Sequence, residues 1–218
     1  TDAEMEAHLA SLPNGGQSQL GSKWAAGDIM YKDLNGDGKI SSGDGTLNDL
    51  GDLKVVANTQ LRFKYGLTLD ASWKGFDFSA FFQGVGKRDV VVGGPYFWGA
   101  NGQGMWQAAA FKDHMDYFRP EDTESVFGPN VDAYYPRVIF GGGSSEGGKN
   151  TLTQSRYVQN GAYIRLKNLQ LGYTLPSTIT KKFAVNSLRV YVSGDNLWTG
   201  TKMRVFDPEV LGSTGDAG

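Results

Sequence analysis

The sequence predicts an all-β fold, an antiparallel transmembrane β-barrel segment of about four long strands with long extracellular loops. The first observation is a pair of long alternating runs at 61–86. The second is the composition, with 31 Gly, 12 Phe and 10 Tyr among 218 residues, which favours strands joined by many turns. The third is that long and short connections alternate along the chain, as they do in such barrels.

The bulk properties narrow the class of protein further. The formal net charge of -2 argues against a nucleic-acid partner, because such partners usually require a basic surface. The chain has no cysteine and therefore no disulfide framework. No apolar stretch approaches the roughly 20 residues of a transmembrane helix. A barrel strand needs no such stretch, because every second side chain of it is polar.

Residues 1–60 are polar and irregular, and we expect them to form an extracellular loop segment. Within it, 33–44 reads DLNGDGKISSGD and matches an EF-hand-type calcium loop. Gly38 falls at position 6, where the loop turns sharply, and Lys39 would contribute its carbonyl at position 7. The candidate ligands, at positions 1, 3, 5, 7, 9 and 12, are Asp33, Asn35, Asp37, Lys39, Ser41 and Asp44.

Closely spaced oxygen side chains in this loop suit Ca²⁺, a hard cation with six or more ligands. Asp44 stands where a bidentate Glu is usual, which should weaken binding. The alternative is a solvated turn that binds no ion. We expect a structural calcium clamp rather than a switch, since no helix pair flanks the loop.

The segment 61–86 contains two alternating runs joined by a very short turn, and we expect it to form a transmembrane β-hairpin. Successive strand side chains point to opposite faces, so each run has one apolar and one hydrophilic face. On the apolar parity of the first run lie Phe63, Tyr65, Leu67, Leu69, Ala71 and Trp73. The hydrophilic residues, which would line the barrel lumen, are Lys64, Thr68, Asp70, Ser72, Asp77, Ser79 and Gln83.

The length of these runs separates two interpretations. Each run has about the 9–11 residues that a tilted strand needs to cross a bilayer. The alternative is an amphipathic hairpin of a soluble sandwich, but a strand there usually has about 5–6 residues.

Residues 87–156 are rich in glycine and aromatic residues, and we expect a long extracellular loop. Aromatic side chains on such a loop can stack on sugars or peptides, or simply pack within the loop. The candidate substrate contacts are Trp98, Trp106, Tyr117 and Phe118. His114 lies near Asp113 and Asp116, but no nucleophile accompanies it, so we expect no catalytic role.

Residues 157–197 are expected to form a second transmembrane hairpin, and 198–218 a further extracellular loop before a missing last strand. The first strand is ambiguous, because Arg165 and Lys167 share the parity of the apolar residues Leu169, Leu171 and Tyr173. The second run, LRVYVSGDNLW, alternates more regularly.

The connections differ in length in a regular way. Those at 74–75 and 176–186 are short, whereas 1–60, 87–156 and 198–218 are long. All long loops therefore emerge at one end of the sheet, as in bacterial outer-membrane barrels with short periplasmic turns and long extracellular loops. We accordingly expect a multi-pass barrel in the outer membrane of a Gram-negative bacterium, in contact with the lipid bilayer.

Several motifs resemble the C-terminal part of SusC/RagA-type TonB-dependent transporters. They are GDIMYKDLNGDGKISSGD, YGLTLDASWKGFDFSAFFQGVGKRD, YPR at 135–137, YIRLKNLQLGYTLP, SLRVYVSGDNLW and FDPE, in this order from about Gly27 onward. The resemblance implies a 22-stranded outer-membrane barrel with an N-terminal plug, energised through TonB. It also implies a SusD-type surface lipoprotein that closes over the barrel, and oligosaccharide or oligopeptide substrates.

The sequence departs from that pattern because it contains no plug, no TonB box and no aromatic-ended strand after Glu209. We therefore expect a piece of a longer transporter that has no enzymatic activity. The first alternative is a secreted, calcium-stabilised carbohydrate-binding module, which would be soluble and have shorter strands. The second is a glycoside hydrolase, but its candidate acids Glu121, Asp122 and Glu124 follow Pro120 in what resembles an exposed turn.

Overall fold

The computed structural model describes residues 1–101, 110–140 and 145–210, which divide into two compact units. The sheet unit comprises Ala57–Val91 and the described part of Val158–Thr214. The loop unit comprises Thr1–Val56 and the described part of Val92–Tyr157. The long alternating runs thus fall in the sheet unit, and most of the irregular segments 1–60 and 87–156 fall in the loop unit.

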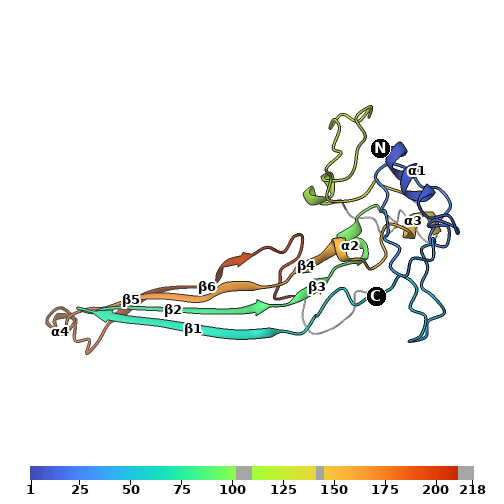
Figure 1. The fold of residues 1–218 in the computed structure, drawn as a ribbon. Coiled ribbons are helices and arrows are strands. Elements are labelled where there is room, and N and C mark those ends of the chain that lie inside the picture. The colour runs from blue at the N-terminus through green and yellow to red at the C-terminus, as the bar shows by residue number, and fades with distance from the viewer. Residues whose placement is uncertain (102–109, 141–144, 211–218) are drawn as a thin grey trace. The chain divides into compact units, whose positions relative to one another are not determined.

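Four long antiparallel strands in the order β1-β2-β5-β6 form the sheet unit (Figure 1). Each has 12 or 13 residues, about twice the usual strand length. The strands are β1 (Arg62–Trp73), β2 (Phe76–Lys87), β5 (Tyr163–Thr174) and β6 (Arg189–Thr201). The predicted all-β, antiparallel fold is thereby confirmed.

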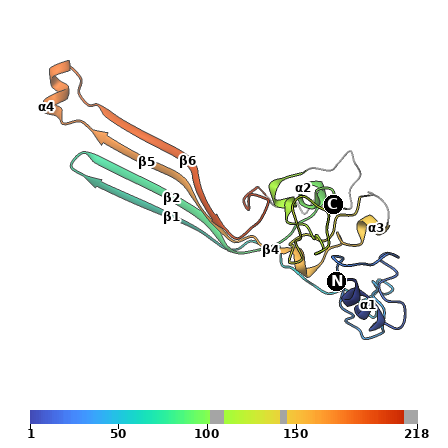
Figure 2. The same cartoon turned by 90° about the horizontal axis from the view of Figure 1, so that it is seen from above.

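Short connections join the long strands at one end of the sheet (Figure 2). β1 and β2 are linked by Lys74 and Gly75, whose φ angles of 48° and 88° suit a tight hairpin turn. β5 and β6 are linked through α4 (Ser177–Thr180) and η3 (Lys181–Phe183). At the opposite end, β3 (Asp89–Val91) pairs with β4 (Val158–Asn160).

The last long strand runs past residue 197, where the sequence suggested a return to loop. Trp198 and Gly200 of β6 pair with Leu166 and Ile164 of β5, so the ladder continues to Thr201. No helix among the described residues is long and apolar enough to cross a membrane.

Short helices and an aromatic cluster organise the loop unit. Its helices are α1 (Asp2–Ala10), α2 (Gly94–Trp98), η1 (Lys112–Met115), α3 (Ser145–Gly148) and η2 (Ser155–Tyr157). The ring of Phe97 is fully buried and lies 4.8 to 6.3 Å, between centroids, from the rings of Trp98, Tyr134, Tyr135 and Tyr157. Such edge-on and tilted arrangements are the ones that aromatic rings prefer in a protein core.

A buried ionic network closes the loop unit around Asp28. The Lys149 ammonium and the Asp28 carboxylate are both fully buried and lie 3.0 Å apart. Arg137 Nε donates to Asp28 Oδ1 at 2.6 Å, and Asn150 Nδ2 donates to the same oxygen at 2.7 Å. Burial raises the pKa of Asp28, but the hydrogen bonds from Arg137, Asn150 and Lys149 outweigh burial and leave that pKa lowered. The carboxylate therefore stays ionised and joins segments more than 100 positions apart.

Candidate functional site

The register of the four-stranded sheet sorts its side chains onto two faces of opposite character. Residues directly opposite one another in an antiparallel ladder share a face. Leu69 pairs with Ala80, which pairs with Leu169. Extended along the ladders, this pairing gives an apolar face made of Tyr65, Leu67, Leu69, Ala71, Trp73, Phe76, Phe78, Ala80, Phe82, Ile164, Leu166, Leu169, Leu171, Tyr173, Val190, Val192 and Trp198.

The apolar face is largely open to its surroundings. Trp73 and Val192 are each 68% exposed, and Leu69, in the middle of β1, is 46% exposed. Soluble monomers rarely expose apolar patches beyond a few hundred Å². A face that spans four strands of this length therefore requires an apolar partner along its whole extent.

A β-bulge at Lys167 resolves the ambiguous pattern of β5. Asn168 pairs with Phe81 and Leu166 pairs with Phe82, so Lys167 is an extra residue in this ladder. Because the side-chain period of a strand is two, one extra residue reverses the parity beyond it. Arg165 consequently moves to the polar face, and Leu166 joins the apolar face. The mixed parity in the sequence thus corresponds to two regular half-strands.

The polar face carries all seven hydrophilic residues of the first hairpin that were predicted to share a face. They are joined by Arg165, Asn168, Gln170, Arg189, Ser193, Asp195 and Thr199. Arg189 Nε donates to Asp77 Oδ1 at 3.0 Å, which links β6 to β2. The link passes over Gly172 of β5, where a Cβ would lie 2.6 Å from both partners. With any larger residue at this position, the two side chains would have to shift from their present places.

A second ionic cluster fixes the segment after β6 to the polar face. Arg165 Nη2 donates to Asp207 Oδ1 at 2.6 Å, and Arg165 Nη1 also bonds to Glu209. Lys167 Nζ lies 2.9 Å from Glu209 Oε1. The residues of FDPE, recognised in the sequence only as a motif, therefore serve as anchors for the chain that follows β6.

The aspartate-rich loop has the hydrogen bonds of an EF-hand-type turn. Asp33 accepts the N–H groups of Gly36 and Gly38 at 2.6 and 2.9 Å, and Asp37 Oδ1 accepts that of Lys39 at 3.1 Å. Gly38 has a φ of 78°, which suits glycine at the sharp turn. The bond from the Gly38 N–H is the main cause of a lowered pKa at Asp33. The backbone of the loop therefore has the turn that an EF-hand-type loop requires.

A residue beyond the end of this loop, Asp52, contacts it in a way that the sequence did not suggest. Asp44 accepts the N–H of Thr46 at 2.8 Å, whereas Asp52 accepts those of Leu34 and Ser41 at 2.6 and 2.8 Å. Within 1–101, 110–140 and 145–210, no three His, Cys, Asp or Glu side chains form a group that could hold a metal ion. Calcium binding by Asp33, Asn35, Asp37, Lys39, Ser41 and Asp44 therefore stays a prediction.

The four aromatic candidates for substrate contact lie in different environments. Trp98 is 5% exposed, and its ring packs edge-on against Tyr157 at 4.7 Å. Tyr117 lies under the Arg119 guanidinium at 4.7 Å, and Phe118 rests on Gly27, where a Cβ would lie 2.2 Å from its ring. Trp106 lies outside the described residues. Substrate contact by any of them stays a prediction.

His114 occupies a structural position. Its Nδ1 accepts the N–H of Phe111 at 3.1 Å, and its Nε2 lies 3.2 and 3.1 Å from the carbonyls of Tyr96 and Phe97. These contacts engage both ring nitrogens in holding η1 against α2.

Comparisons with known proteins agree with the motif resemblance. No family model matches the chain. The TonB-dependent receptor P3 of Formosa agariphila is 31% identical over 199 residues, which are 91% of this chain and 17% of the relative. The TonB-dependent receptor P26 of the same organism is 31% identical over 195 residues, again 17% of its length.

Two solved structures are also similar to this chain. The RagAB peptide importer in the open-open state is 28% identical, with a TM-score of 0.47. The match covers 68% of this chain and 14% of the importer chain. The RagAB peptide transporter is 30% identical, with a TM-score of 0.49. The match covers 70% of this chain and 15% of the transporter chain.

The chain thus spans 17% of the length of the two curated relatives described above. The sequence identity extends through both units, from the loop unit to the four long strands, because it covers 91% of this chain. The resemblance to TonB-dependent transporters is thus confirmed over most of this chain, which corresponds to one segment of the curated TonB-dependent receptors.

Proposed function

We propose that the four-stranded sheet is part of the wall of a transporter barrel in the outer membrane of a Gram-negative bacterium. The observation that carries the proposal is the two-faced sheet. In a barrel wall its apolar face would contact lipid and its polar face would line water. Strands of 12 or 13 residues exceed the roughly 9–11 needed to span the bilayer. A secreted carbohydrate-binding module would have to cover the same apolar face with other protein.

The sheet edges support continuation of the barrel on both sides. Among the described residues β1 and β6 each have one neighbouring strand in the sheet. Unpaired backbone groups cannot remain in lipid, so further strands would pair with both edges. In the proposed 22-stranded barrel, the long segments are extracellular, and the plug and TonB contact come from other parts of the transporter.

The proposed role is import of oligosaccharides or oligopeptides through the barrel, with a SusD-type lipoprotein as the extracellular lid and TonB as the energy source. The SusC-like motifs and the names of the curated relatives, which are receptors and not enzymes, support it. In this role the chain binds and guides a substrate without breaking covalent bonds.

A pair of neighbouring substitutions in the full-length transporter tests the barrel proposal. Leu69→Arg places a charge on the apolar face near mid-strand, which costs about 2–4 kcal/mol at the bilayer midplane. Thr68→Arg, one position away, places the same side chain on the polar face, where water solvates it. We expect Leu69→Arg to reduce the amount of folded barrel in the outer membrane and Thr68→Arg to leave it near the parent level. Equal effects of the two substitutions would contradict the proposal.

We further propose that 33–44 binds Ca²⁺ as a structural clamp within an extracellular segment. Carboxylate, amide and carbonyl oxygens are the ligands that calcium prefers, and the turn already has the required backbone form. Calorimetry on the full-length transporter should detect calcium uptake that is lost in Asp33→Ala with Asp37→Ala. The exposed Asp132 provides the control, since Asp132→Ala should bind as the parent does. Absence of uptake by the parent protein would refute the clamp.

A further inference from the structure

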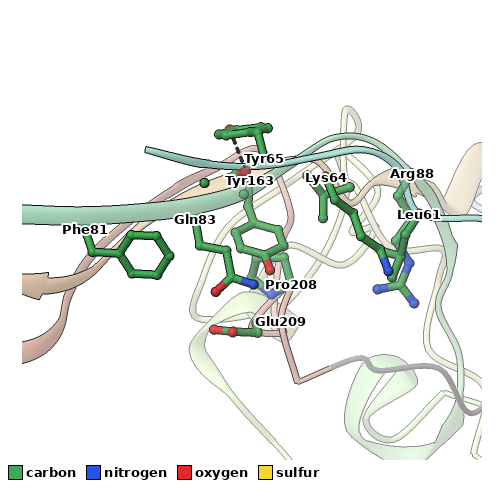
Figure 3. A pocket seen from close by; sticks show the side chains of 12 residues that line it. Leu61, Lys64, Tyr65, Phe81, Gln83, Arg88, Tyr163, Pro208 and Glu209 are labelled. Carbon is green, nitrogen blue, oxygen red and sulfur yellow. Dashed lines mark hydrogen bonds between the residues drawn. The ribbon is translucent and has the colours of Figure 1, made fainter. Parts of the chain in front are cut away.

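A pocket of about 580 Å³ lies on the polar face at the end of the sheet where the long segments attach. The beginning of β1 supplies Lys64, the end of β2 supplies Gln83, and Arg88 follows directly after β2. The anchored segment after β6 adds Glu209 (Figure 3). The volume lies within the range of about 300–1,000 Å³ typical of small-molecule sites.

Two cations of this pocket have no anionic partner among the described residues. Lys64 and Arg88 both line the pocket, and Figure 3 shows their side chains extending to the side of the strand where Gln83 and Glu209 lie. The Nε atom of Arg88 is buried and has no hydrogen-bond partner among the described residues. An unsatisfied buried donor is costly, and the cost is greater when the group is charged. The pocket therefore lacks an acceptor that a ligand could provide.

The single carboxylate in the pocket does not neutralise these cations. Glu209 is already engaged with Arg165 and with Lys167, whose Nζ is 2.9 Å from Glu209 Oε1. Asp207, two positions earlier, also binds Arg165. The charges of this second cluster are thus mutually paired, and Glu209 is not available as the partner of Lys64 or Arg88.

We propose that this pocket binds a carboxylate carried by the incoming substrate. Arginine recognises the planar carboxylate by paired N–H donors, and the lysine adds a point charge. The inference rests on the proposed transport function, in which this end of the sheet is extracellular and the polar face lines the lumen. An acidic substrate would then meet the pocket soon after it passes the lid, and the two cations would attract it.

Calorimetry on the full-length purified transporter tests the site with four probes. Trigalacturonate and N-acetyl-triglutamate carry carboxylates on a sugar and a peptide, and maltotriose and N-acetyl-trialanine amide are their neutral counterparts. We expect an acidic probe to bind more tightly than its neutral counterpart. Arg88→Gln should weaken that binding by roughly tenfold or more, as expected for loss of a charge-assisted hydrogen bond. The acidic probe that responds identifies the sugar or the peptide as the source of the carboxylate.

Three further variants test the role of charge. Arg88→Lys should retain more of the affinity than Arg88→Gln, and Lys64→Gln tests the pocket independently if Arg88→Gln fails to fold. Lys182→Gln, in the short connection at the other end of the sheet, should bind as the parent does. The site is refuted if acidic probes bind no more tightly than neutral ones, or if neither Arg88→Gln nor Lys64→Gln weakens them. The barrel proposal would still stand if Leu69→Arg reduces the amount of folded barrel and Thr68→Arg does not.

Discussion

At the scale of single residues, glycines determine which side chains can meet across the sheet. Gly172 allows the Asp77–Arg189 pair to bridge two strands over a third. Gly84 leaves space for Tyr65, whose hydroxyl donates to the Tyr163 carbonyl at 3.1 Å; a Cβ at Gly84 would lie 2.4 Å from that hydroxyl. The alternating pattern predicts the faces of a strand, but such contacts depend on register, which the pattern does not contain.

Glu146 makes the loop unit sensitive to acid. Its Oε1 accepts the Ser22 N–H at 2.5 Å, and this bond, with the Ser22 hydroxyl and Lys149, lowers the pKa of Glu146 from 4.5 to about 2. Because the folded pKa is the lower one, the bonds contribute full stability above about pH 4.5, and the contribution is lost as the pH falls towards 2. We expect hydrogen-exchange protection at Ser22, corrected for intrinsic rates, to fall between pH 5 and pH 3.

Matched variants isolate the carboxylate of Glu146. Glu146→Gln should give lower protection at Ser22 with little dependence on pH over this range, since an amide does not titrate. Glu121→Gln, at an exposed position, should keep the pH dependence of the parent. An unchanged pH dependence in Glu146→Gln would show that another group is responsible.

At the scale of elements, the sequence predicted the strands better than their internal irregularities. Runs of alternating residues identify β1 and β2, and a two-residue turn containing Gly75 identifies their connection. The bulge at Lys167 was not predicted, because an extra residue appears in a sequence only as a break in parity. β6 is irregular beside this bulge, because Asn196, which lies between the paired residues Asp195 and Trp198, has a positive φ of 52°.

Deletion of Lys167 tests the function of the bulge. Without the extra residue, a continuous β5 must place either Arg165 on the apolar face or Leu169 on the polar face, because a one-residue shift reverses every side chain beyond it. We expect the deletion to prevent assembly of the full-length barrel, measured as loss of the heat-modifiable folded band on electrophoresis. Lys167→Gln, which keeps the residue count, should assemble. Normal assembly of the deletion variant would show that the bulge is dispensable.

The sequence predicted the local features of the candidate sites but not the contacts between residues that lie far apart in the chain. Local signals predict the EF-hand-type turn at 33–44, because each position of that motif has a defined role, and the turn forms while its calcium binding stays a prediction. Asp52 was missed because it reaches back to Leu34 and Ser41 across the loop. The pairing of Arg165 with Asp207 joins residues 42 positions apart, and the Arg88 pocket combines four separate stretches of chain. Sequence spacing carries no signal for contacts of that range.

At the scale of the whole molecule, the proposed barrel wall requires each face of the sheet to contact a different medium. The polar face holds the ion pairs and the pocket, and the apolar face holds only carbon-rich side chains and glycines between the strand ends. In a barrel wall this division has one arrangement, with water inside and lipid outside. The calcium loop and the aromatic cluster would then belong to the extracellular loops that surround the entrance.

The most direct measurement is the accessibility of nitroxide labels placed one at a time along 66–73 of β1 in the full-length transporter, reconstituted in lipid vesicles. Dissolved oxygen reports lipid contact, and a water-soluble nickel complex reports contact with water. We predict an alternation with a period of two, in which Leu67, Leu69 and Ala71 respond to oxygen and Thr68, Asp70 and Ser72 respond to nickel. Equal access of the nickel complex to every position would contradict the assignment of this sheet to a membrane barrel.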